Sequence, residues 1–200
     1  IKWRVLDADK ANDGTTSGMF LLSEHLLGST KFRGRSNVWQ GSDAQKWCTD
    51  FASNSSNFST AEQSAMQGIA KEDSSETLYS VPWGASSLTE QDKMFFLSAR
   101  ELTDYVGDYD GAPGLSATDT AQIAGYWWLR SPLANYTSTA GLVFDFGTVY
   151  GYLVSDDWAA RPAFNLNLNS VLFTSAAVGG KSANGMDSGL TAIGNYAGNE

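Results

Sequence analysis

Apolar and polar positions along the first residues of the chain predict a strand hairpin. Residues 1–7 alternate apolar with polar side chains, which is the pattern of a half-buried strand. Residues 19–22 form an uninterrupted apolar run, which is typical of a more buried strand. A turn-rich stretch, residues 14–18, separates the two. We therefore expect an antiparallel pair at the start of the chain.

Helix starts are marked by capping boxes, in which a serine hydroxyl accepts a backbone N–H and an acid or amide three residues later reaches back. The pairs are Ser42 with Gln45, Ser59 with Glu62, and Ser98 with Glu101. Apolar residues follow each start at helical spacing, so we expect amphipathic helices that cover a sheet. A further helix is expected over residues 116–124.

After Gly125 the pattern changes to strands alone. Residues 126–131, 142–146, 148–154 and 163–168 are candidate strands separated by glycine or polar turns. Helices early and strands late predict an α+β domain with an antiparallel sheet. Residues 174–200 are rich in Gly, Ala, Ser and Asn, so we expect a domain at residues 1–173 followed by a linker or a truncated module. Because the chain begins within a predicted strand, we also expect it to be part of a longer polypeptide.

The composition of the chain argues against some classes of binding partner. A chain of 200 residues with 42% hydrophobic residues can build one substantial core. The net charge is −9 and the 13 Lys and Arg residues are scattered, which argues against a nucleic-acid partner. No apolar run approaches the roughly 20 residues that a membrane span requires, so we expect no direct membrane insertion.

Residues suited to catalysis or metal binding are few. His25 is the only histidine and Cys48 the only cysteine, so a zinc site or a nucleophile–base pair lacks partners. Cys48 falls on the apolar face of the first predicted helix, where we expect an inert thiol. Asp108, Asp110 and Gly111 match part of a calcium loop without its remaining ligands. We expect no enzyme activity, no cofactor and no metal ion; a carboxylate pair for glycoside hydrolysis stays open as an alternative.

Two aromatic–basic motifs near the end of the chain predict a rigid framework. Residues 126–132 read Tyr-Trp-Trp-Leu-Arg-Ser-Pro, and residues 160–164 read Ala-Arg-Pro-Ala-Phe. Adjacent tryptophans are bulky and costly to leave unpacked. Arg130 and Arg161 could grip an anionic ligand, or they could bind carbonyls and carboxylates and fix the two strands. We favour the second interpretation.

Residues 133–157, between the two motifs, have a different composition. They include Asn, Tyr, Thr, Ser, Phe, Asp and Gly but no Lys, Glu, Gln, Met or Trp, which favours contact area and adaptable hydrogen bonds. If Val143 and Val149 point into the core, strand alternation directs Phe144, Tyr150 and Tyr152 to the opposite face. We expect residues 133–158 to form an aromatic and acidic surface that binds a ligand. The alternative is an ordinary β-meander with a solvated polar face.

With these residues in view, the chain resembles bacterial C-type-lectin-like domains, distant relatives of the formylglycine-generating sulfatase-modifying fold. The resemblance covers about residues 1–170 and rests on residues 1–6, 20–23, 42–47, 96–98 with Glu101, 126–132 and 160–164. It implies an α+β C-type-lectin-like fold. Enzymes of this group use a pair of active-site cysteines, and their calcium-dependent lectins use Glu-Pro-Asn-like or Trp-Asn-Asp-like triplets. This chain has neither, so neither activity is implied.

Within this group the chain is most similar to variable proteins of diversity-generating retroelements, whose late residues are rewritten by adenine-directed mutagenesis. AAC codons randomised at their adenines cannot yield Lys, Glu, Gln, Met or Trp, and residues 133–157 and 159–180 obey that restriction. The ligand-facing positions implied by this resemblance are Asn135, Tyr136, Ser138, Leu142, Phe144, Asp145, Phe146, Tyr150, Tyr152, Ser155, Asp156 and Asp157. The resemblance implies a cell-surface, extracellular or phage-borne adhesion domain that binds a protein or glycan. Alternatives are a structural spacer of a bacterial surface protein and a carbohydrate-binding or carbohydrate-active domain.

Overall fold

A computed structural model describes residues 1–15, 17–106, 118–119, 125–144, 147–169, 174–175 and 191–192. The helices are α1 (Asp43–Ser53), α2 (Thr60–Ala65) and α3 (Ala99–Glu101), which continues as the π-helical segment η1 (Leu102–Val106). The strands are β1 (Trp3–Asp7), β2 (Gly18–Ser23), β3 (His25–Leu26), β4 (Ser29–Lys31), β5 (Met66–Gln67), β6 (Lys71–Asp73), β7 (Glu76–Leu78), β8 (Val81–Trp83), β9 (Ser86–Leu88), β10 (Met94–Phe96), β11 (Thr118–Asp119), β12 (Trp127–Pro132), β13 (Thr139–Val143), β14 (Val149–Leu153), β15 (Asp157–Ala159), β16 (Pro162–Asn167), β17 (Thr174–Ser175) and β18 (Thr191–Ala192).

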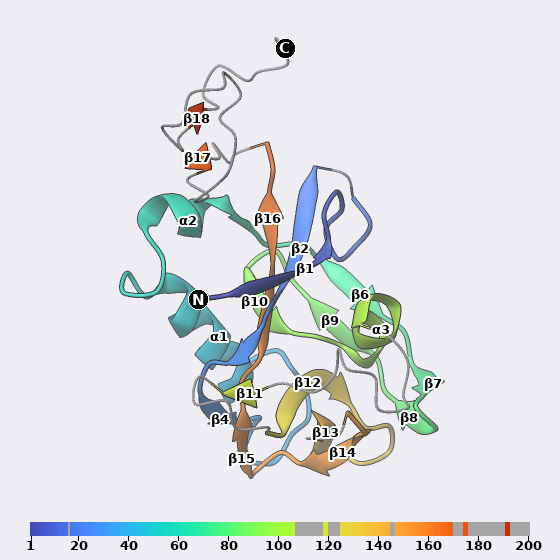
Figure 1. The fold of residues 1–200 in the computed structure, drawn as a ribbon. Helices are drawn as coiled ribbons and strands as arrows, with labels where there is room; N and C mark the ends of the chain where they lie inside the picture. The colour runs from blue at the N-terminus through green and yellow to red at the C-terminus, as the bar shows by residue number, and fades with distance from the viewer. Residues whose placement is uncertain are drawn as a thin grey trace.

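Two five-stranded sheets organise the part of the chain that the structure describes (Figure 1). The first sheet has the order β1-β2-β16-β10, with β5 also paired to β16, and all of its pairs are antiparallel. The second sheet has the order β14-β13-β12-β15-β4 and is antiparallel except for the pair of β12 with β15. Short two-stranded pairs complete the arrangement. The domain is therefore α+β with mostly antiparallel sheets, as the sequence predicted.

The sheets mix early and late strands, which the sequence did not predict. β16 lies between β2 and β10 in the first sheet, and β15 lies between β12 and β4 in the second. Every described element after Gly125 is a strand, as predicted, but the pairing of late strands with early ones was not predicted, because local patterns do not specify partners that lie far away in the sequence. The predicted helix over residues 116–124 was wrong at residues 118–119, which form β11 parallel to β3; its other residues lie outside those described.

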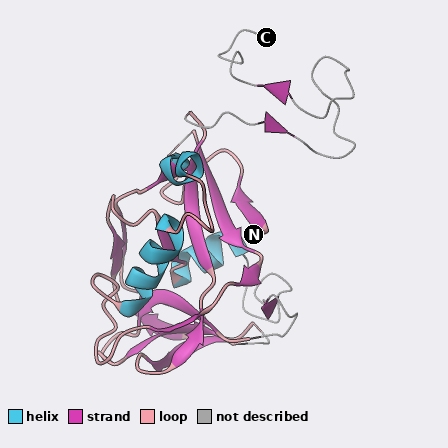
Figure 2. Cartoon of the chain, turned by 90° about the vertical axis from the view of Figure 1, so that its left-hand side faces the viewer, coloured by secondary structure: helices cyan, strands magenta, loops and turns pink. Residues whose placement is uncertain are grey.

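The predicted capping residues begin all three helices. Ser42, Ser59 and Ser98 each accept a hydrogen bond from the backbone N–H three residues later, and the boxes at Ser59 and Ser98 are complete. α1 buries Ala44 and Cys48 on the face predicted from the sequence. Figure 2, which views the left-hand side of Figure 1, shows α1 and α2 in front of the strands. α1 and α2 therefore cover one side of the first sheet, as expected.

Both aromatic–basic motifs lie in the core. Trp127, Trp128, Arg130 and Arg161 are fully buried. The Arg161 guanidinium lies over the Trp127 ring at 4.8 Å from its centroid, and the Arg161 Nε donates to the Ser23 carbonyl at 3.0 Å. A buried guanidinium that stacks on an aromatic ring packs as well as it pairs. The structural interpretation of the two arginines is confirmed, and the second sheet has a rigid base.

Candidate functional site

The second sheet presents one aromatic face, which we call the aromatic surface. Its members are Tyr126, Phe144, Tyr150, Tyr152 and Trp158. Tyr150 is the cross-strand partner of Leu142, and Leu142 is in turn the partner of Trp128, so these side chains share one face of the sheet. Alternation along β12 and β14 places Tyr126 and Tyr152 on the same face.

Four rings of the aromatic surface contact one another edge to face in a closed circuit. Tyr126 lies 5.0 Å from Phe144 and 5.1 Å from Trp158, measured between ring centroids. Tyr152 closes the circuit at 5.3 Å from Trp158 and 6.3 Å from Phe144. Edge-to-face contacts at these distances are favourable beyond the area they bury. The rings therefore fix one another before any ligand arrives, which lowers the entropy cost of binding.

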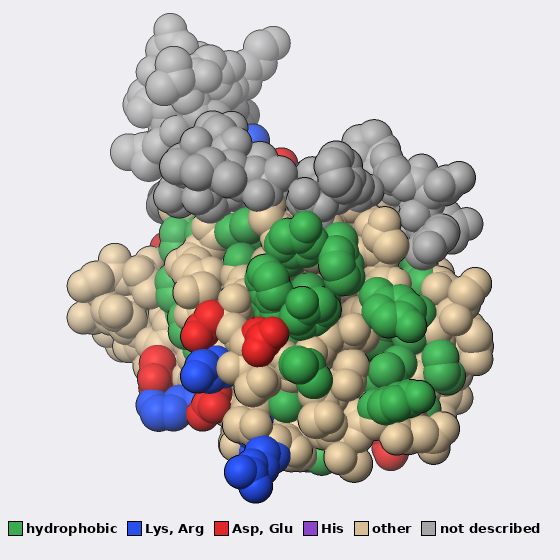
Figure 3. Space-filling model, turned by 90° about the horizontal axis from the view of Figure 1, so that it is seen from below, with side chains coloured by type: hydrophobic (Ala, Val, Ile, Leu, Met, Phe, Trp, Pro, Cys, Tyr) green, Lys and Arg blue, Asp and Glu red, His purple; other side chains and the backbone are tan. Residues whose placement is uncertain are grey.

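Two members of the aromatic surface, Tyr150 and Tyr152, are exposed to solvent, as are Tyr136 and Leu153 near it. The exposed fractions are 63% for Tyr136, 58% for Tyr150, 52% for Leu153 and 37% for Tyr152. Figure 3, which views the molecule from below Figure 1, shows hydrophobic side chains gathered on this face with acidic side chains beside them. Aromatic residues enriched at a surface are typical of binding sites.

Most of the positions predicted to face a ligand lie at the surface. Asn135, Tyr136, Ser138, Tyr150, Tyr152, Ser155 and Asp157 are exposed, and Phe144 and Asp156 are half-buried. Leu142 is fully buried, so its prediction as a surface residue was wrong. The reason is that β13 is an interior strand, and Leu142 lies between the larger rings of Trp128 and Tyr150. Asp145 and Phe146 lie outside the described residues.

Asn37 supports the turn beside this surface, and no sequence pattern predicted this role. Its Nδ2 donates to the carbonyls of Leu133, Tyr136 and Thr139 at 3.2, 2.9 and 2.9 Å. Its backbone N–H donates to the Thr137 carbonyl at 2.8 Å. One buried side chain from the first quarter of the chain thus fixes the turn that carries Tyr136. Trp158 belongs to the surface predicted over residues 133–158 but was not among the ligand-facing positions, and Tyr126 was predicted as framework, although its ring lies 5.1 Å from that of Trp158.

A family model described as Domain of unknown function (DUF6273) matches residues 16–168. The chain belongs to this family. The DUF6273 match spans the strands from β2 to β16 and therefore includes the whole aromatic surface and Asn37. No curated protein and no solved structure matches the chain.

A buried charge cluster lies within the DUF6273 match, and its members are Lys71, Asp73, Glu101 and Arg130. Arg130 donates to Glu101 Oε1 at 2.9 Å and to Asp73 Oδ2 at 2.6 Å. Lys71 Nζ lies 2.9 Å from both Asp73 Oδ1 and Glu101 Oε1. The four formal charges cancel, which is the arrangement in which buried ions are tolerated. Asn12 adds a hydrogen bond to Glu101 at 2.7 Å.

The charge cluster keeps Glu101 ionised. Burial by itself would raise the pKa of Glu101, but Arg130 and Lys71 outweigh that effect and lower the pKa from 4.5 to about 2. A carboxyl group with so low a pKa, bound to an arginine out of reach of solvent, is a poor proton donor or acceptor near neutral pH. The cluster is therefore part of the support beneath the second sheet.

Lowering the pH should destabilise the fold, because Glu101 becomes protonated and loses its charge. A carboxyl group whose pKa is lowered on folding contributes stability above its unfolded pKa and loses it as the pH falls through the folded value. From the pKa of about 2, we expect the free energy of unfolding to fall by about 3 kcal/mol between about pH 5 and pH 2. Urea titrations at several pH values measure this slope. An unfolding free energy independent of pH over that range would contradict the assignment.

Other candidate groups for chemistry are isolated. Burial raises the pKa of the Cys48 thiol well above its ordinary value, and the negative charge of Asp92 raises it further. A raised pKa agrees with the inert thiol predicted from the sequence. Among the described residues, no group of three or more His, Cys, Asp or Glu side chains could hold a metal ion. The calcium-like fragment at residues 108–111 lies outside those residues. No helix in the described ranges is long and apolar enough to cross a membrane.

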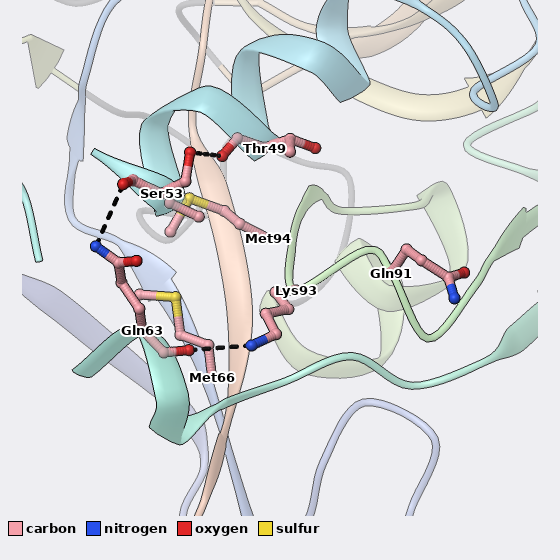
Figure 4. A pocket seen from close by; sticks show the side chains of 8 residues that line it. Thr49, Ser53, Gln63, Met66, Gln91, Lys93 and Met94 are labelled. Carbon is pink, nitrogen blue, oxygen red and sulfur yellow. Dashed lines mark hydrogen bonds between the residues drawn. The ribbon is translucent and has the colours of Figure 1, made fainter. Parts of the chain in front are cut away.

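A small pocket lies beside α1 and α2, with a volume of about 170 Å³ (Figure 4). Met66 and Met94 line it. The polar groups beside them are paired within the protein, since Gln63 donates to the Ser53 carbonyl at 3.3 Å and Lys93 donates to the Gln63 carbonyl at 3.2 Å. Ligand pockets are usually larger, at about 300 Å³ or more, and offer convergent polar groups. The aromatic surface is the better candidate site.

Proposed function

We propose that this domain binds a macromolecular ligand, a protein or a glycan, through the aromatic surface and performs no chemistry of its own. The observation that carries the proposal is the pair of exposed tyrosines Tyr150 and Tyr152 beside rings that edge-to-face contacts fix, together with the exposed Tyr136 on the turn that Asn37 holds. Tyrosine supplies a large contact area and a hydroxyl at little entropy cost. Such residues commonly dominate the binding energy of an interface.

We also propose that the fold is C-type-lectin-like and that the surface is diversified by a retroelement, on the surface of a bacterial cell or on a phage particle. Two features support this proposal. The late strand β16 lies beside β2 in the middle of the first sheet, so that the ends of the domain meet in one framework. The exposed positions come from residues 133–157, whose composition fits adenine-directed mutagenesis. Sequences of sibling genes test it: variation should include codons 136, 150 and 152 and spare the codons of the buried charge cluster.

Replacing Tyr136, Tyr150 and Tyr152 together with Ala should abolish binding while leaving the fold intact. We expect an affinity loss of at least about 100-fold, because exposed aromatic anchors each contribute about 2 kcal/mol or more to interfaces of this kind. We expect the Tm to shift by less than about 3 °C, because surface substitutions cost little stability. The measurement is a screen of the purified domain on a glycan array and on a panel of extracellular proteins, followed by calorimetric titration of each hit.

Val38→Ala is the matched control, since Val38 is 53% exposed and is not part of the aromatic surface. It should bind every hit as the wild type does. An equal loss of ligand affinity in the control and in the triple variant would show that the ligand does not bind through the three tyrosines. Unfolding of the triple variant would show that the tyrosines stabilise the core.

A further inference from the structure

A second pocket, which we call the Glu72 pocket, lies where the strand pair β6–β9 meets the end of β12. Its volume is about 120 Å³. The residues that matter for its chemistry are Trp39, Gln40, Glu72, Ala85, Ser87 and Pro132, all of which line it. Pockets for whole small molecules usually measure about 300 Å³ or more. A space of this size therefore suits one side chain of a larger partner.

Glu72 supplies a carboxylate at this pocket. Glu72 in β6 and Ser87 in β9 are cross-strand partners, so their side chains lie on one face of the strand pair, and both line the pocket. Both residues are exposed. Lys71 and Asp73, the neighbours of Glu72 in the chain, belong to the buried charge cluster, whereas Glu72 forms no ion pair with any described residue. Its charge is therefore available to a partner.

Asp92 adds a second negative charge behind the wall of the Glu72 pocket. Trp39 Nε1 donates to Asp92 Oδ1 at 3.2 Å, and Gln40 Nε2 donates to Asp92 Oδ2 at 2.9 Å. Burial by itself would raise the pKa of Asp92, but hydrogen bonds from Gln45, Thr89 and Gln40 outweigh that effect and lower the pKa. Asp92 is therefore ionised at neutral pH, and each of these donors is neutral.

Two basic side chains near these carboxylates do not cancel their charge. Lys93 follows Asp92 in the chain, but its Nζ donates to the Gln63 carbonyl at 3.2 Å, at the pocket drawn in Figure 4. Arg33 Nη1 donates to the Gln40 carbonyl at 3.1 Å and forms no ion pair with either carboxylate. The Glu72 pocket thus combines apolar walls with negative charge that no described ion pair neutralises.

We infer that the Glu72 pocket holds a lysine or arginine side chain of a protein partner, with the aliphatic stem against Ala85 and Pro132 and the cation beside Glu72. Such side chains pack their stems on apolar surface and keep the charged end in water, which matches a pocket with an exposed carboxylate. Negative charge at the pocket also attracts a cationic partner. Pro132 directly precedes the turn that carries Tyr136, so a partner that contacts this turn lies close to the pocket. The inference rests on the pocket and its charges and does not require the aromatic surface to bind a ligand.

Amide correlation spectra of the nitrogen-labelled 200-residue chain test the inference with two probes. N-acetyl-arginine amide carries the cation, and N-acetyl-citrulline amide has nearly the same shape without the charge. The arginine probe should shift the amide signals of Glu72, Ala85 and Ser87 in a saturable way, with a dissociation constant in the millimolar range. The citrulline probe should bind about fivefold more weakly, the difference expected from one partly exposed ion pair. Equal binding of the two probes, or shifts confined to other residues, would overturn the inference.

Glu72→Gln should weaken binding of the arginine probe to the level of the citrulline probe. Glu90→Gln is the matched control, because Glu90 is also exposed, forms no ion pair with a described residue and does not line the Glu72 pocket. The control should bind the arginine probe as the wild type does. Both variants should unfold at the temperature of the wild type, since both carboxylates are at the surface. Equal loss of affinity in the two variants would show that net charge and not the pocket attracts the probe, and the inference would fall.

Discussion

Glu101→Gln is expected to lower the free energy of unfolding by about 3–5 kcal/mol, the cost of removing one partner from a buried ion pair. Glutamine keeps a side-chain oxygen that can accept the Ser98 N–H, so the helix cap survives the change. What is lost is the charge that Arg130 and Lys71 face in a site without solvent. In a domain of this size we expect the Tm to fall by about 10 °C. Thermal and urea unfolding at pH 7 measure the effect.

Glu62→Gln is the control for the cap. Glu62 and Glu101 both occupy the third position of a complete capping box, but Glu62 is exposed and Glu101 is fully buried. The Glu62 variant should stay within about 0.5 kcal/mol of the wild type. The two variants should also differ in acid, because Glu101→Gln removes the large pH dependence expected from a pKa of about 2, whereas the pKa of the exposed Glu62 is lowered chiefly by its hydrogen bond with the Ser59 side chain. Equal losses would mean that the cap, not the charge cluster, supplies the stability.

Glu101 also shows which structural features could be predicted from the sequence and which could not. Its place in a capping box follows from three-residue spacing and was predicted. Its pairing with Arg130, Lys71 and Asp73 joins segments that are far apart in the sequence, and no local pattern specifies such contacts. The same limit explains why β16 was predicted as a strand but not as the partner of β2. Local structure could be derived, whereas pairing between distant segments could not.

The candidate site likewise has features that could be predicted from the sequence and features that could not. Alternation along β14 correctly predicted that Val149 is buried and that Tyr150 and Tyr152 are exposed. The resemblance placed Leu142 among the ligand-facing positions, and this was wrong, because an interior strand with packing on both sides has no exposed face. Asn37 was missed because its role depends on carbonyls about one hundred residues later in the chain. The exposed positions could be found from composition, but the side chains that hold them in place could not.

Trp128→Ala should remove about 3–5 kcal/mol of stability, as truncation of a buried tryptophan does. Trp128 is fully buried, contacts Phe32 with ring centroids 5.7 Å apart, and donates from Nε1 to the Thr30 carbonyl at 2.8 Å. Its loss would leave a cavity and an unpaired carbonyl between β12 and β4. Urea unfolding should show the full decrease. Ligand binding at temperatures where the variant stays folded should change little, since Trp128 does not reach the surface.

Tyr150→Ala is the matched change on the same face. Leu142 has Trp128 on one neighbouring strand and Tyr150 on the other, so the two variants truncate aromatic partners of one residue. Tyr150 is 58% exposed, and its truncation should cost less than about 0.5 kcal/mol while weakening ligand binding about tenfold or more. Opposite effects of the two variants on stability and binding would separate framework from binding surface within one sheet. If Tyr150→Ala were as destabilising as Trp128→Ala, the outer strand would belong to the core, and the proposed binding surface would have to be abandoned.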